Sequence, residues 1–367
     1  MLAIGLMSGT SLDGVDAAVL ETDGIDLVRP LGACSIAYGE GDRRVLQAAT
    51  RRALSLDQPG SDPQLDEAIT ALTRTHLAAV DRLLHQLSVP IDQIALVGFH
   101  GQTVAHRPDR GWTWQLGDGA ALATALDVAV VNDFRTADVA AGGEGAPLLP
   151  AYHRARLAGS RAPTVVLNLG GIANITFLRG SAQPDAEPVA FDTGPANGLV
   201  DHWLTATTGQ AYDAGGRLAA RGAVDTGVLD RLLEHPYFTR PAPKSLDRAD
   251  FTLDAVRHLE PADGAATLTA FTAAAVARGI DLLPARPERV LVAGGGRHNA
   301  TMKIMLGRAT GLPVDPVETV GWDGDATEAE GFGYLAVRSR LGLPITFPGT
   351  TGVAEPRTGG RLHSPLR

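Results

Sequence analysis

The first sixteen residues, MLAIGLMSGTSLDGVD, constrain the fold of this chain more than any other stretch. Residues 2–7 are a short apolar run that fits a buried strand, and residues 15–20 fit a returning strand. Between them, residues 8–13 form a turn of small hydroxyl residues around Gly9. The tip of such a hairpin exposes backbone N–H groups and hydroxyls, which suit phosphate oxygens. An ordinary hairpin turn has the same pattern when it is considered alone.

The same design occurs a second time in the chain. Residues 164–169 are an apolar strand, Gly170-Gly171 is a turn, and residues 172–177 return as a strand. The two copies share little sequence identity, so they indicate a repeated architecture rather than a sequence repeat. A third glycine feature, Gly294-Gly295-Gly296, directly follows the predicted strand 290–293.

Strands and helices alternate along the rest of the chain, which favours an α/β fold. Asp62 followed by Pro63 predicts the start of a long helix that ends before Pro90. Other expected helices lead up to Gly209, cover 268–283 and 326–341, and run from an Asn299 cap to Gly311; further strands are expected at 94–99, 112–116 and 128–131. From Pro344 onward the chain is rich in Gly, Pro and Thr, and we expect it to be irregular.

Composition narrows the class of protein. With 367 residues the chain can hold two domains, and its net charge of −9 argues against nucleic acid or an anionic membrane as the main partner. A single cysteine, Cys34, excludes an intrachain disulfide. The sequence has no signal-peptide pattern and no apolar run of about 18 residues, so we expect a cytoplasmic protein.

Several common catalytic motifs are absent from the sequence. It has no P-loop, no G-x-G-x-x-G after a strand and no H-E-x-x-H pair. The segment from Gly9 to Asp13 approaches a nucleophile elbow, but Asp13 stands where the second glycine belongs. We therefore do not assign Ser11 as a nucleophile. His100 and His106 are six residues apart across a glycine, which is poor spacing for zinc.

Two phosphate hairpins and a triple glycine remain as the candidate site. Hairpins that face each other across a cleft would hold a nucleotide's phosphates from both sides. Glycines after a strand let the backbone lie flat against an adenine or a ribose. This combination is typical of the sugar kinase, actin and chaperone ATPase superfamily, whose fold is two ribonuclease-H-like domains with an interdomain cleft. We expect the first domain at 1–155 and the second, nucleotide-binding one at 156–340, with segment 340–367 a candidate to pack back on the first.

Nine motifs then occur in a distinctive order along nearly the whole chain, from Ile4 to about Pro344. They read GLMSGTSLDGVD, GFHGQTVAHRP, QLGDGA, NDFRTADVAAGGEGAPL, NLGGIANIT, FDTGPAN, PYFTRPAPKS, VAGGGRHN and DATEAEGFGYLAVR. Together they closely resemble the anhydro-N-acetylmuramic acid kinase family. The chain departs from the family pattern at Gly215, at Leu246-Asp247 and at Glu330. These departures bear on substrate affinity or loop geometry more than on the reaction.

The resemblance implies an unusual kinase reaction in peptidoglycan recycling. A family enzyme hydrolyses the internal bridge of 1,6-anhydro-N-acetylmuramic acid and phosphorylates the freed 6-oxygen with ATP, giving N-acetylmuramic acid 6-phosphate. ATP and Mg²⁺ are therefore the implied cofactors, and the sugar is the implied partner. A homodimer would rest on the resemblance alone.

Asp192 is the carboxylate best suited to be the general base, because it is expected to follow a strand and to precede Gly194 and a helix. One carboxylate is enough for this reaction, because the γ-phosphoryl group accepts the leaving oxygen. A glycosidase needs a second carboxylic acid to protonate that oxygen. The alternative is that Asp192 only caps the following helix.

The resemblance also assigns binding residues. The ATP and phosphate residues are Gly9, Thr10, Ser11, Leu12, Asp13, Gly14, Asp16, Gly170, Gly171, Asn174, Gly294, Gly295, Gly296 and Asn299. No direct metal ligand is assigned; Asp13 or Asp16 would act through water, or either is simply a turn residue.

The sugar pocket is assigned to His100, Thr103, Arg135 and Glu328. Arg135 suits the lactyl carboxylate through a charge-assisted fork, against the alternative of a surface salt bridge. For Glu328 the alternative is a solvated helix face, which its neighbour Glu330 favours. Lys244 fits either phosphate neutralisation or a helix C-terminus, and the sequence does not choose between them.

Two other functions compete with this interpretation. One is a kinase of the same superfamily that acts on an ordinary sugar hydroxyl, with Asp192 deprotonating that hydroxyl. The other is a nucleotide-dependent switch ATPase, either chaperone-like or filament-forming.

Overall fold

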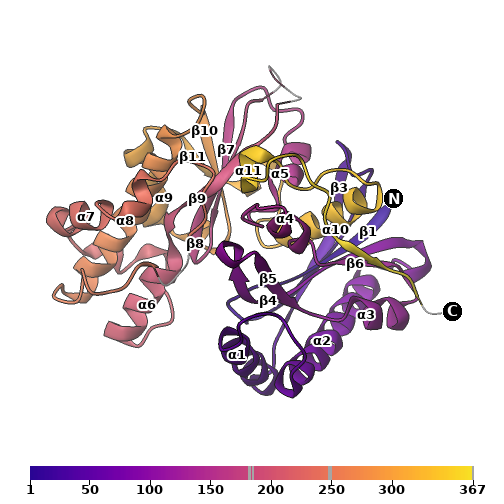
Figure 1. Cartoon of the computed structure of the whole chain (residues 1–367). Helices are drawn as coiled ribbons and strands as arrows, with labels where there is room; N and C mark the ends of the chain where they lie inside the picture. Colours follow the sequence, from indigo (N-terminus) through magenta and orange to yellow (C-terminus); the bar gives the residue numbers. More distant parts are fainter. Residues whose placement is uncertain (181–182, 184–185, 247–249, 366–367) are drawn as a thin grey trace. The chain divides into compact units, whose positions relative to one another are not determined.

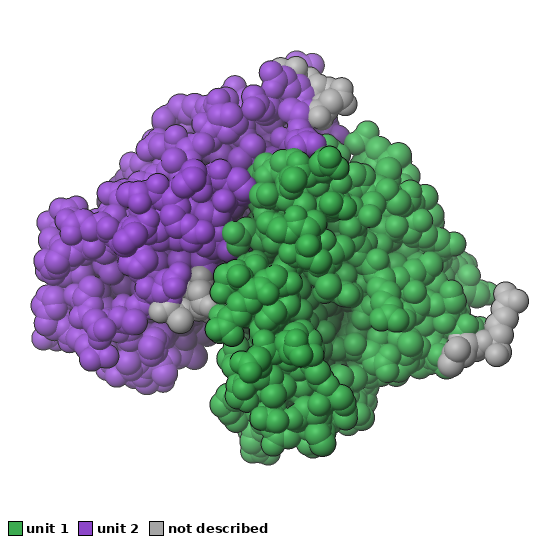
Figure 2. Space-filling model, in the orientation of Figure 1, with its two compact units in different colours: residues 1–156, 326–367 green, residues 157–325 purple. Residues whose placement is uncertain are grey.

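The computed structural model describes residues 1–180, 183, 186–246 and 250–365. The chain divides into two compact units (Figure 2). Unit 1 consists of residues 1–156 and 326–367, and unit 2 of residues 157–325. Each unit is an α/β structure with one mixed sheet.

The sheet of unit 1 has seven strands in the order β12-β6-β4-β1-β2-β3, with β5 paired to β4. Strands β1, β2 and β3 are antiparallel neighbours, whereas β4 is parallel to β1 and β6 is parallel to β4. Its strands are β1 (Leu2–Ser8), β2 (Gly14–Thr22), β3 (Val28–Ala37), β4 (Ile94–Arg107), β5 (Trp112–Leu116), β6 (Val130–Asn132) and β12 (Arg361–His363).

Helices cover both faces of this sheet. Ile4 and Leu6 of β1 belong to the core formed with α1 and α2, whereas Ala3 belongs to the core formed with α5 and α10. This alternation follows from the two-residue period of a strand. The helices of unit 1 are α1 (Glu40–Leu54), α2 (Pro63–Leu87), α3 (Gly119–Leu126), α4 (Thr136–Ala140), α5 (Pro150–Arg156), α10 (Thr327–Arg340) and α11 (Pro348–Thr351).

Helix α10 packs on the unit 1 sheet, beside β1 and β4 (Figure 1). The approach is so close that a Cβ on Gly5 would lie 1.7 Å from the carbonyl oxygen of Ala329, and one on Gly98 would lie 2.1 Å from that of Phe332. The compact units therefore divide at 325/326, whereas the sequence suggested a boundary at 340. The difference arises because α10 packs against two glycines that lie hundreds of residues before it in the chain, so its contacts are with unit 1.

The C-terminal segment contains regular structure that its composition did not indicate. Helix α11 begins at Pro348, and β12 pairs antiparallel with β6 through Arg361–Asn132, Leu362–Val131 and His363–Val130. The expectation of an irregular tail was wrong here, because a partner strand far away in the sequence supplies the pairing.

The sheet of unit 2 has five strands in the order β11-β10-β7-β8-β9. They are β7 (Thr164–Leu169), β8 (Ile172–Leu178), β9 (Val189–Pro195), β10 (Arg289–Ala293) and β11 (Val314–Pro316). Strands β7, β8 and β9 are antiparallel neighbours, and β10 and β11 continue in parallel from β7. The helices of unit 2 are α6 (Asn197–Thr208), α7 (Thr226–Leu233), α8 (Pro261–Asp281) and α9 (Ala300–Thr310).

The two sheets share one topology. The order β3-β2-β1-β4-β6 in unit 1 corresponds to β9-β8-β7-β10-β11 in unit 2, with three antiparallel strands followed by two parallel ones. This is the order of a ribonuclease-H-like sheet, and it confirms the predicted fold class. The repeat seen in the sequence is therefore a repeat of the fold.

Some elements differ from those expected. Strand β3 was not predicted, because none of its residues is buried and its sequence contains Pro30 and Gly32. Strand β4 continues through His100 and Thr103 to Arg107, although the sequence suggested a loop there. Similarly, Asp192 lies inside β9 and does not follow it. None of the described helices is both long and apolar enough to cross a membrane.

Candidate active site

The β1–β2 loop is a five-residue connection, Gly9 to Asp13, between Ser8 and Gly14. The N–H of Leu12 donates to the Gly9 carbonyl at 3.2 Å, and Leu12 has a left-handed backbone with φ 56°. This backbone turns the Leu12 side chain into the core and leaves Thr10, Ser11 and Asp13 exposed. The Ser11 hydroxyl donates to the Asp13 carboxylate at 2.8 Å. The loop thus presents polar side chains on a tip that one buried leucine anchors.

Ser8 lies directly before this loop, is buried, and forms hydrogen bonds that hold the start of the loop. Its Oγ donates to Gln102 Oε1 at 2.6 Å and lies 2.7 Å from the Tyr38 hydroxyl. Burial raises the pKa of Tyr38 to about 12, although its hydrogen bond with Ser8 opposes this shift. Gln102 and Tyr38 were not singled out in the sequence. Gln102 lies within the GFHGQTVAHRP motif, but only the parallel pairing of β4 with β1 brings it to Ser8.

Asp16 lies in β2, beyond the loop, where its carboxylate accepts a hydrogen bond from Ser35 of β3. It is half-buried, whereas Asp13 is exposed. Among the described residues, no group of three or more His, Cys, Asp or Glu side chains is arranged to hold a metal ion. Asp13 and Asp16 are thus the carboxylates on or beside the loop, and carboxylate oxygens are suitable donors to magnesium-bound water.

His100 and Arg135, both predicted sugar-pocket residues, are in direct contact. Two nitrogens of the Arg135 guanidinium, Nη2 and Nε, lie 3.0 and 3.3 Å from His100 Nε2. Since a guanidinium only donates, His100 Nε2 accepts, and its Nδ1–H donates to the Gly101 carbonyl at 2.8 Å. Burial and the positive charge of Arg135 hold the pKa of His100 well below its usual range. His100 is thus a neutral side chain that orients the arginine.

The Arg135 guanidinium also donates through Nη1 to the Gly145 carbonyl at 2.8 Å. Burial lowers the pKa of Arg135 to about 10, while the carboxylates of Glu328 and Asp138 act in the opposite direction. Glu328 of α10 is therefore near enough to influence Arg135. Three of the four predicted sugar-pocket residues come together in unit 1, and Arg135 is not the surface salt bridge considered as its alternative.

Asp138 supports this cluster and was missed in the sequence. It is buried, accepts from the Gly145 N–H at 2.7 Å and accepts from the Thr351 hydroxyl at 2.7 Å. Its carboxylate holds the glycine-rich loop whose Gly145 carbonyl receives Arg135. The motif NDFRTADVAAGGEGAPL contains Asp138, but nothing in the sequence predicted that Thr351 would bind it.

Thr103, the fourth predicted residue, lies on β4 at a bulge opposite β5. Its hydroxyl accepts from Gln115 Nε2 at 3.3 Å.

Glu330 is buried, and its carboxylate accepts hydrogen bonds from Tyr152 and Arg156, the latter at 2.6 Å. The burial of Glu330 therefore gives no support to the alternative that Glu328 lies on a solvated helix face, and Glu328 is itself half-buried.

In unit 2, the β7–β8 turn consists of only Gly170 and Gly171. Its carbonyls are occupied by the start of α6: the Asn197 N–H donates to Gly170 at 3.0 Å, and the Ala196 N–H donates to Gly171 at 3.0 Å. Asn197 Nδ2 also donates to the Leu169 carbonyl at 2.8 Å. Because the carbonyls of this turn already accept hydrogen bonds from α6, the polar groups that it can offer to a ligand are its backbone N–H groups.

Asp192 lies on β9 directly opposite Asn174 of β8, which in turn pairs with Asn168 of β7. Its Oδ2 accepts from the Leu246 N–H at 3.0 Å. Helix α6 begins at Asn197 with Ala196 as the cap, so Asp192 is not the helix cap considered as its alternative. Its half-buried carboxylate is presented from a rigid strand, which suits a catalytic group.

The backbone around Asp192 is held by Tyr237 and Lys244. The Asp192 carbonyl accepts from the Tyr237 hydroxyl, and its N–H donates to the Lys244 carbonyl at 3.0 Å. The Lys244 ammonium donates to the Tyr237 carbonyl at 3.0 Å and lies 4.5 Å from the centre of the Tyr237 ring. Burial lowers the pKa of Lys244. These contacts connect Lys244 and the 3-10 helix 236–239 to the backbone of Asp192. Lys244 therefore helps to hold strand β9 in place.

The glycines after β10 lie against β7. Gly294 has φ 73°, and a Cβ there would lie 2.3 Å from Asn168 Oδ1; a Cβ on Gly296 would lie 2.5 Å from that of Leu169. Gly295 is exposed, and a Cβ there would have nothing within 4 Å. Asn299 caps α9 by accepting from the Met302 N–H at 2.9 Å, as predicted. Of these three glycines, Gly295 is therefore the one where a side chain would not clash with the rest of the protein.

Like Glu330, the other departures from the family pattern have a structural account where the structure describes them. Gly215 has φ 68°, a left-handed conformation that favours glycine, and it is exposed. Leu246 is buried and donates its N–H to Asp192. Asp247 lies outside the described residues.

The chain matches the family model described as anhydro-N-acetylmuramic acid kinase over residues 1–364. A protein of that name from Rhizorhabdus wittichii is 58% identical over 365 residues, covering 100% of this chain and 99% of the relative. Another, from Zymomonas mobilis, is 53% identical and covers 99% of this chain and 100% of the relative. Among solved structures, component A of the (R)-2-hydroxyglutaryl-CoA dehydratase of Acidaminococcus fermentans has 11% identity and a TM-score of 0.48, covering 93% of this chain and 99% of that one.

Proposed function

The chain belongs to the anhydro-N-acetylmuramic acid kinase family, and from this premise we propose how its residues carry out the reaction. The substrate is 1,6-anhydro-N-acetylmuramic acid, and the products are N-acetylmuramic acid 6-phosphate and ADP, a step of peptidoglycan recycling. We place the reaction in the cytoplasm, where ATP is available. The full-length match at high identity is the observation that carries this proposal.

We propose that Asp192 is the general base. It takes a proton from a water molecule, whose oxygen forms a bond to the anomeric carbon of the sugar. The bond from that carbon to the 6-oxygen breaks, and the 6-oxygen forms a bond to the γ-phosphorus of ATP as ADP leaves. One water and one phosphoryl group are thus consumed for each sugar, and Asp192 retains one proton to be released. The rigid position of Asp192 on β9 supports this role.

The sugar is held by the cluster of His100, Arg135 and Glu328 in unit 1. Arg135 is already oriented by His100 and Gly145, so it loses little conformational freedom when it binds a carboxylate. We assign the lactyl carboxylate to Arg135. Thr103 on β4 and Glu328 on α10 then hydrogen-bond hydroxyl or amide groups of the sugar.

ATP is held by backbone groups and glycines more than by charged side chains. We assign its phosphates to the β1–β2 loop from Gly9 to Gly14 and to the turn Gly170-Gly171 with Asn174. The nucleoside is assigned to Gly294-Gly295-Gly296 and Asn299, where an absent side chain lets it approach the backbone. Magnesium supplies charge neutralisation on the phosphates when bound. The donor chemistry of Asp13 and Asp16 fits orienting its water ligands.

One experiment separates this reaction from its alternatives. ADP release is measured with the anhydro-sugar, with plain N-acetylmuramic acid and without sugar, and the anhydro-sugar reaction is repeated in ¹⁸O-labelled water. We expect ADP release only with the anhydro-sugar and one label at the anomeric carbon of the product. Phosphorylation without label would instead indicate transfer to an ordinary hydroxyl, and sugar-independent ADP release would indicate a switch ATPase.

A further inference from the structure

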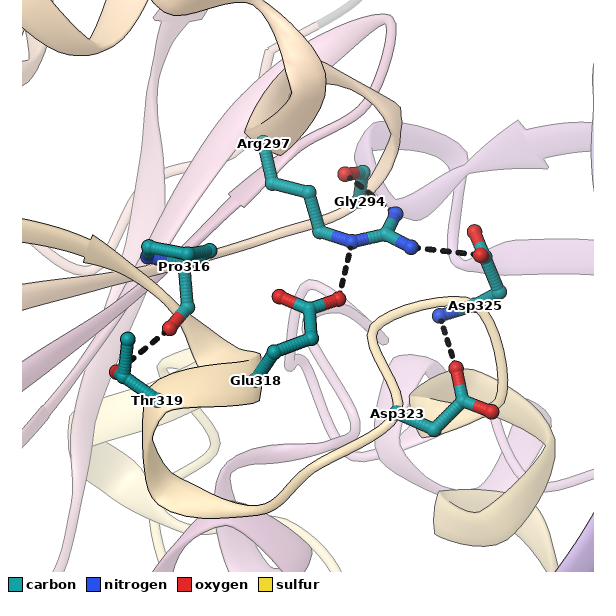
Figure 3. A network of polar contacts seen from close by, with 7 residues as sticks. All are labelled: Gly294, Arg297, Pro316, Glu318, Thr319, Asp323 and Asp325. Atoms are coloured by element: carbon teal, nitrogen blue, oxygen red, sulfur yellow. Dashed lines mark hydrogen bonds and ion pairs between the residues drawn. The ribbon is translucent and has the colours of Figure 1, made fainter.

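Arg297 is a buried cation at the edge of the glycine loop that follows β10 (Figure 3). Its Nε donates to Glu318 Oε1 at 2.7 Å, its Nη2 to Asp325 Oδ2 at 2.6 Å, and its Nη1 to the Gly294 carbonyl at 3.1 Å. The Arg297 N–H donates to the same carbonyl at 3.1 Å. The residue therefore holds the first glycine of the loop twice, through its backbone and through its side chain.

The charge of Arg297 is unusual for its environment. Its side chain is 4% exposed, whereas those of Glu318 and Asp325 are 45% and 75% exposed. Burial acts to lower the pKa of Arg297, but the hydrogen bonds that it donates to Asp325 and Glu318 outweigh burial and raise the pKa. The hydrogen bond with Arg297 also lowers the pKa of Asp325. A buried cation with two carboxylate partners is therefore ionised across the physiological range of pH.

The guanidinium also fits closely against the neighbouring backbone. A Cβ on Gly324 would lie 2.3 Å from Arg297 Nε and 2.8 Å from its Cζ. On its other side, the Gly294 that Arg297 holds has φ 73° and lies against Asn168 of β7. Arg297 thus fills the space between the glycine loop and segment 318–325. Nothing in the reaction proposed above uses this side chain.

We propose that Arg297 is a positioning residue for the nucleotide site, which acts by fixing the shape of the loop Gly294–Gly296. This inference rests on the assignment of that loop to ATP. The planar fork of Arg297 reaches one carbonyl and two carboxylates at once, which a lysine ammonium does not do. Glu318 and Asp325 serve to hold the fork in place. Arg297 therefore sets the affinity for ATP while leaving the sugar cluster of unit 1 and the base Asp192 unchanged.

The test compares four variants, Arg297→Met, Arg297→Lys, Glu318→Gln and Asp325→Asn, with Arg289→Met as the matched control. Arg289 begins β10, the same strand that leads into the loop, but it donates to Thr164 Oγ1 at 3.2 Å, at the strand's other end. For each variant kcat, the KM for ATP and the KM for the anhydro-sugar are measured, together with Tm. Binding of a fluorescent ATP analogue is measured separately, without turnover.

We expect Arg297→Met to raise the KM for ATP roughly 30-fold, which corresponds to about 2 kcal/mol, with kcat and the sugar KM within about threefold of wild type. Arg297→Lys should recover part of the loss, and each carboxylate variant should raise the KM for ATP about threefold to fivefold. The control should change Tm without a selective change in the KM for ATP.

Several results would overturn the inference. These are an unchanged KM for ATP in Arg297→Met, equal changes in both KM values and kcat, or the same pattern in Arg289→Met. If Arg297→Met does not fold, Glu318→Gln and Asp325→Asn decide the question, because both partners are exposed. If the wild-type protein releases no ADP with the anhydro-sugar, the proposed function fails, while binding of the ATP analogue still tests the role of Arg297.

Discussion

The two hairpins that open the two sheets have the same topology and different chemistry. The β1–β2 connection has five residues, buries Leu12 and exposes Thr10, Ser11 and Asp13. The β7–β8 connection has two glycines, whose carbonyls accept N–H groups from the start of α6. The first hairpin therefore offers side chains at a tip, whereas the second offers backbone only.

This difference extends through the two units. In unit 1 the candidate groups are side chains, the neutral His100 of β4 and the charged Arg135 after β6 and Glu328 of α10. In unit 2 they are glycines and one carboxylate on a strand. Under the proposed assignments, one repeated fold serves two kinds of ligand contact, because the topology sets where the loops lie and the loop residues decide what they bind.

The largest effect is expected at Asp192. Asp192→Asn keeps the size of the side chain and an oxygen that accepts from the Leu246 N–H, so the protein should fold with an unchanged Tm. Turnover should fall by about 10²-fold or more, because the amide does not accept a proton. Steady-state ADP release with the anhydro-sugar measures this effect. Turnover close to that of wild type would contradict the role of Asp192 as base.

A second prediction concerns the side-chain site of unit 1. Arg135→Lys should raise the KM for the sugar by roughly 10-fold to 100-fold, since the lysine loses the fork that holds His100, Gly145 and a carboxylate together. The KM for ATP should change little. Arg107→Lys, also on unit 1, is the matched control. An equal rise in both KM values would contradict a specific contact with the sugar.

A third prediction compares the two hairpin tips directly. A Cβ on Gly170 would have its nearest neighbour at 3.6 Å, and one on Gly9 at 3.3 Å, so Gly170→Ala and Gly9→Ala should both fold. If both tips contact phosphates, each substitution should raise the KM for ATP roughly tenfold, which is about 1.4 kcal/mol. Gly159→Ala, where a Cβ would have nothing within 4 Å, is the control. A KM change at only one tip would show that a single hairpin binds the phosphates.

A fourth prediction concerns stability in acid, where the effect should have opposite signs in the two units. Burial lowers the pKa of His76 in unit 1 from 6.5 to about 4, so the unfolded state binds more protons between these values and stability is lost as pH falls through that window. In unit 2, burial and Asp213 raise the pKa of Asp201 from 3.8 to about 6. There the folded state binds more protons between 3.8 and 6, so acidification adds stability.

Hydrogen exchange at pH 5 and pH 7 measures this contrast unit by unit. Protection should decrease in unit 1 at pH 5, by up to about 2 kcal/mol from His76 alone, and not in unit 2. His76→Leu should reduce the loss, since the buried histidine Nε2 has no hydrogen-bond partner among the described residues. Earlier acid unfolding of unit 2 would contradict this prediction.

The sequence determined the elements whose signals are local. The strands and glycine turn of each hairpin, the Asp62 and Asn299 helix caps and the order of nine family motifs were all readable, because strand period, capping and turn chemistry act over a few residues. For this reason the fold class and family were predicted correctly.

Tertiary structure alone decided the features that join distant segments. The bond from Arg135 to His100, the support of Gly145 by Asp138 and Thr351, and the packing of α10 against Gly5 link residues far apart in the chain. The role of Arg297 belongs to this group as well, since its partners Glu318 and Asp325 lie more than a helix away in the chain. A sequence pattern reports the periodicity of one element, whereas these contacts depend on how elements pack, and packing is set only when the whole sheet is assembled.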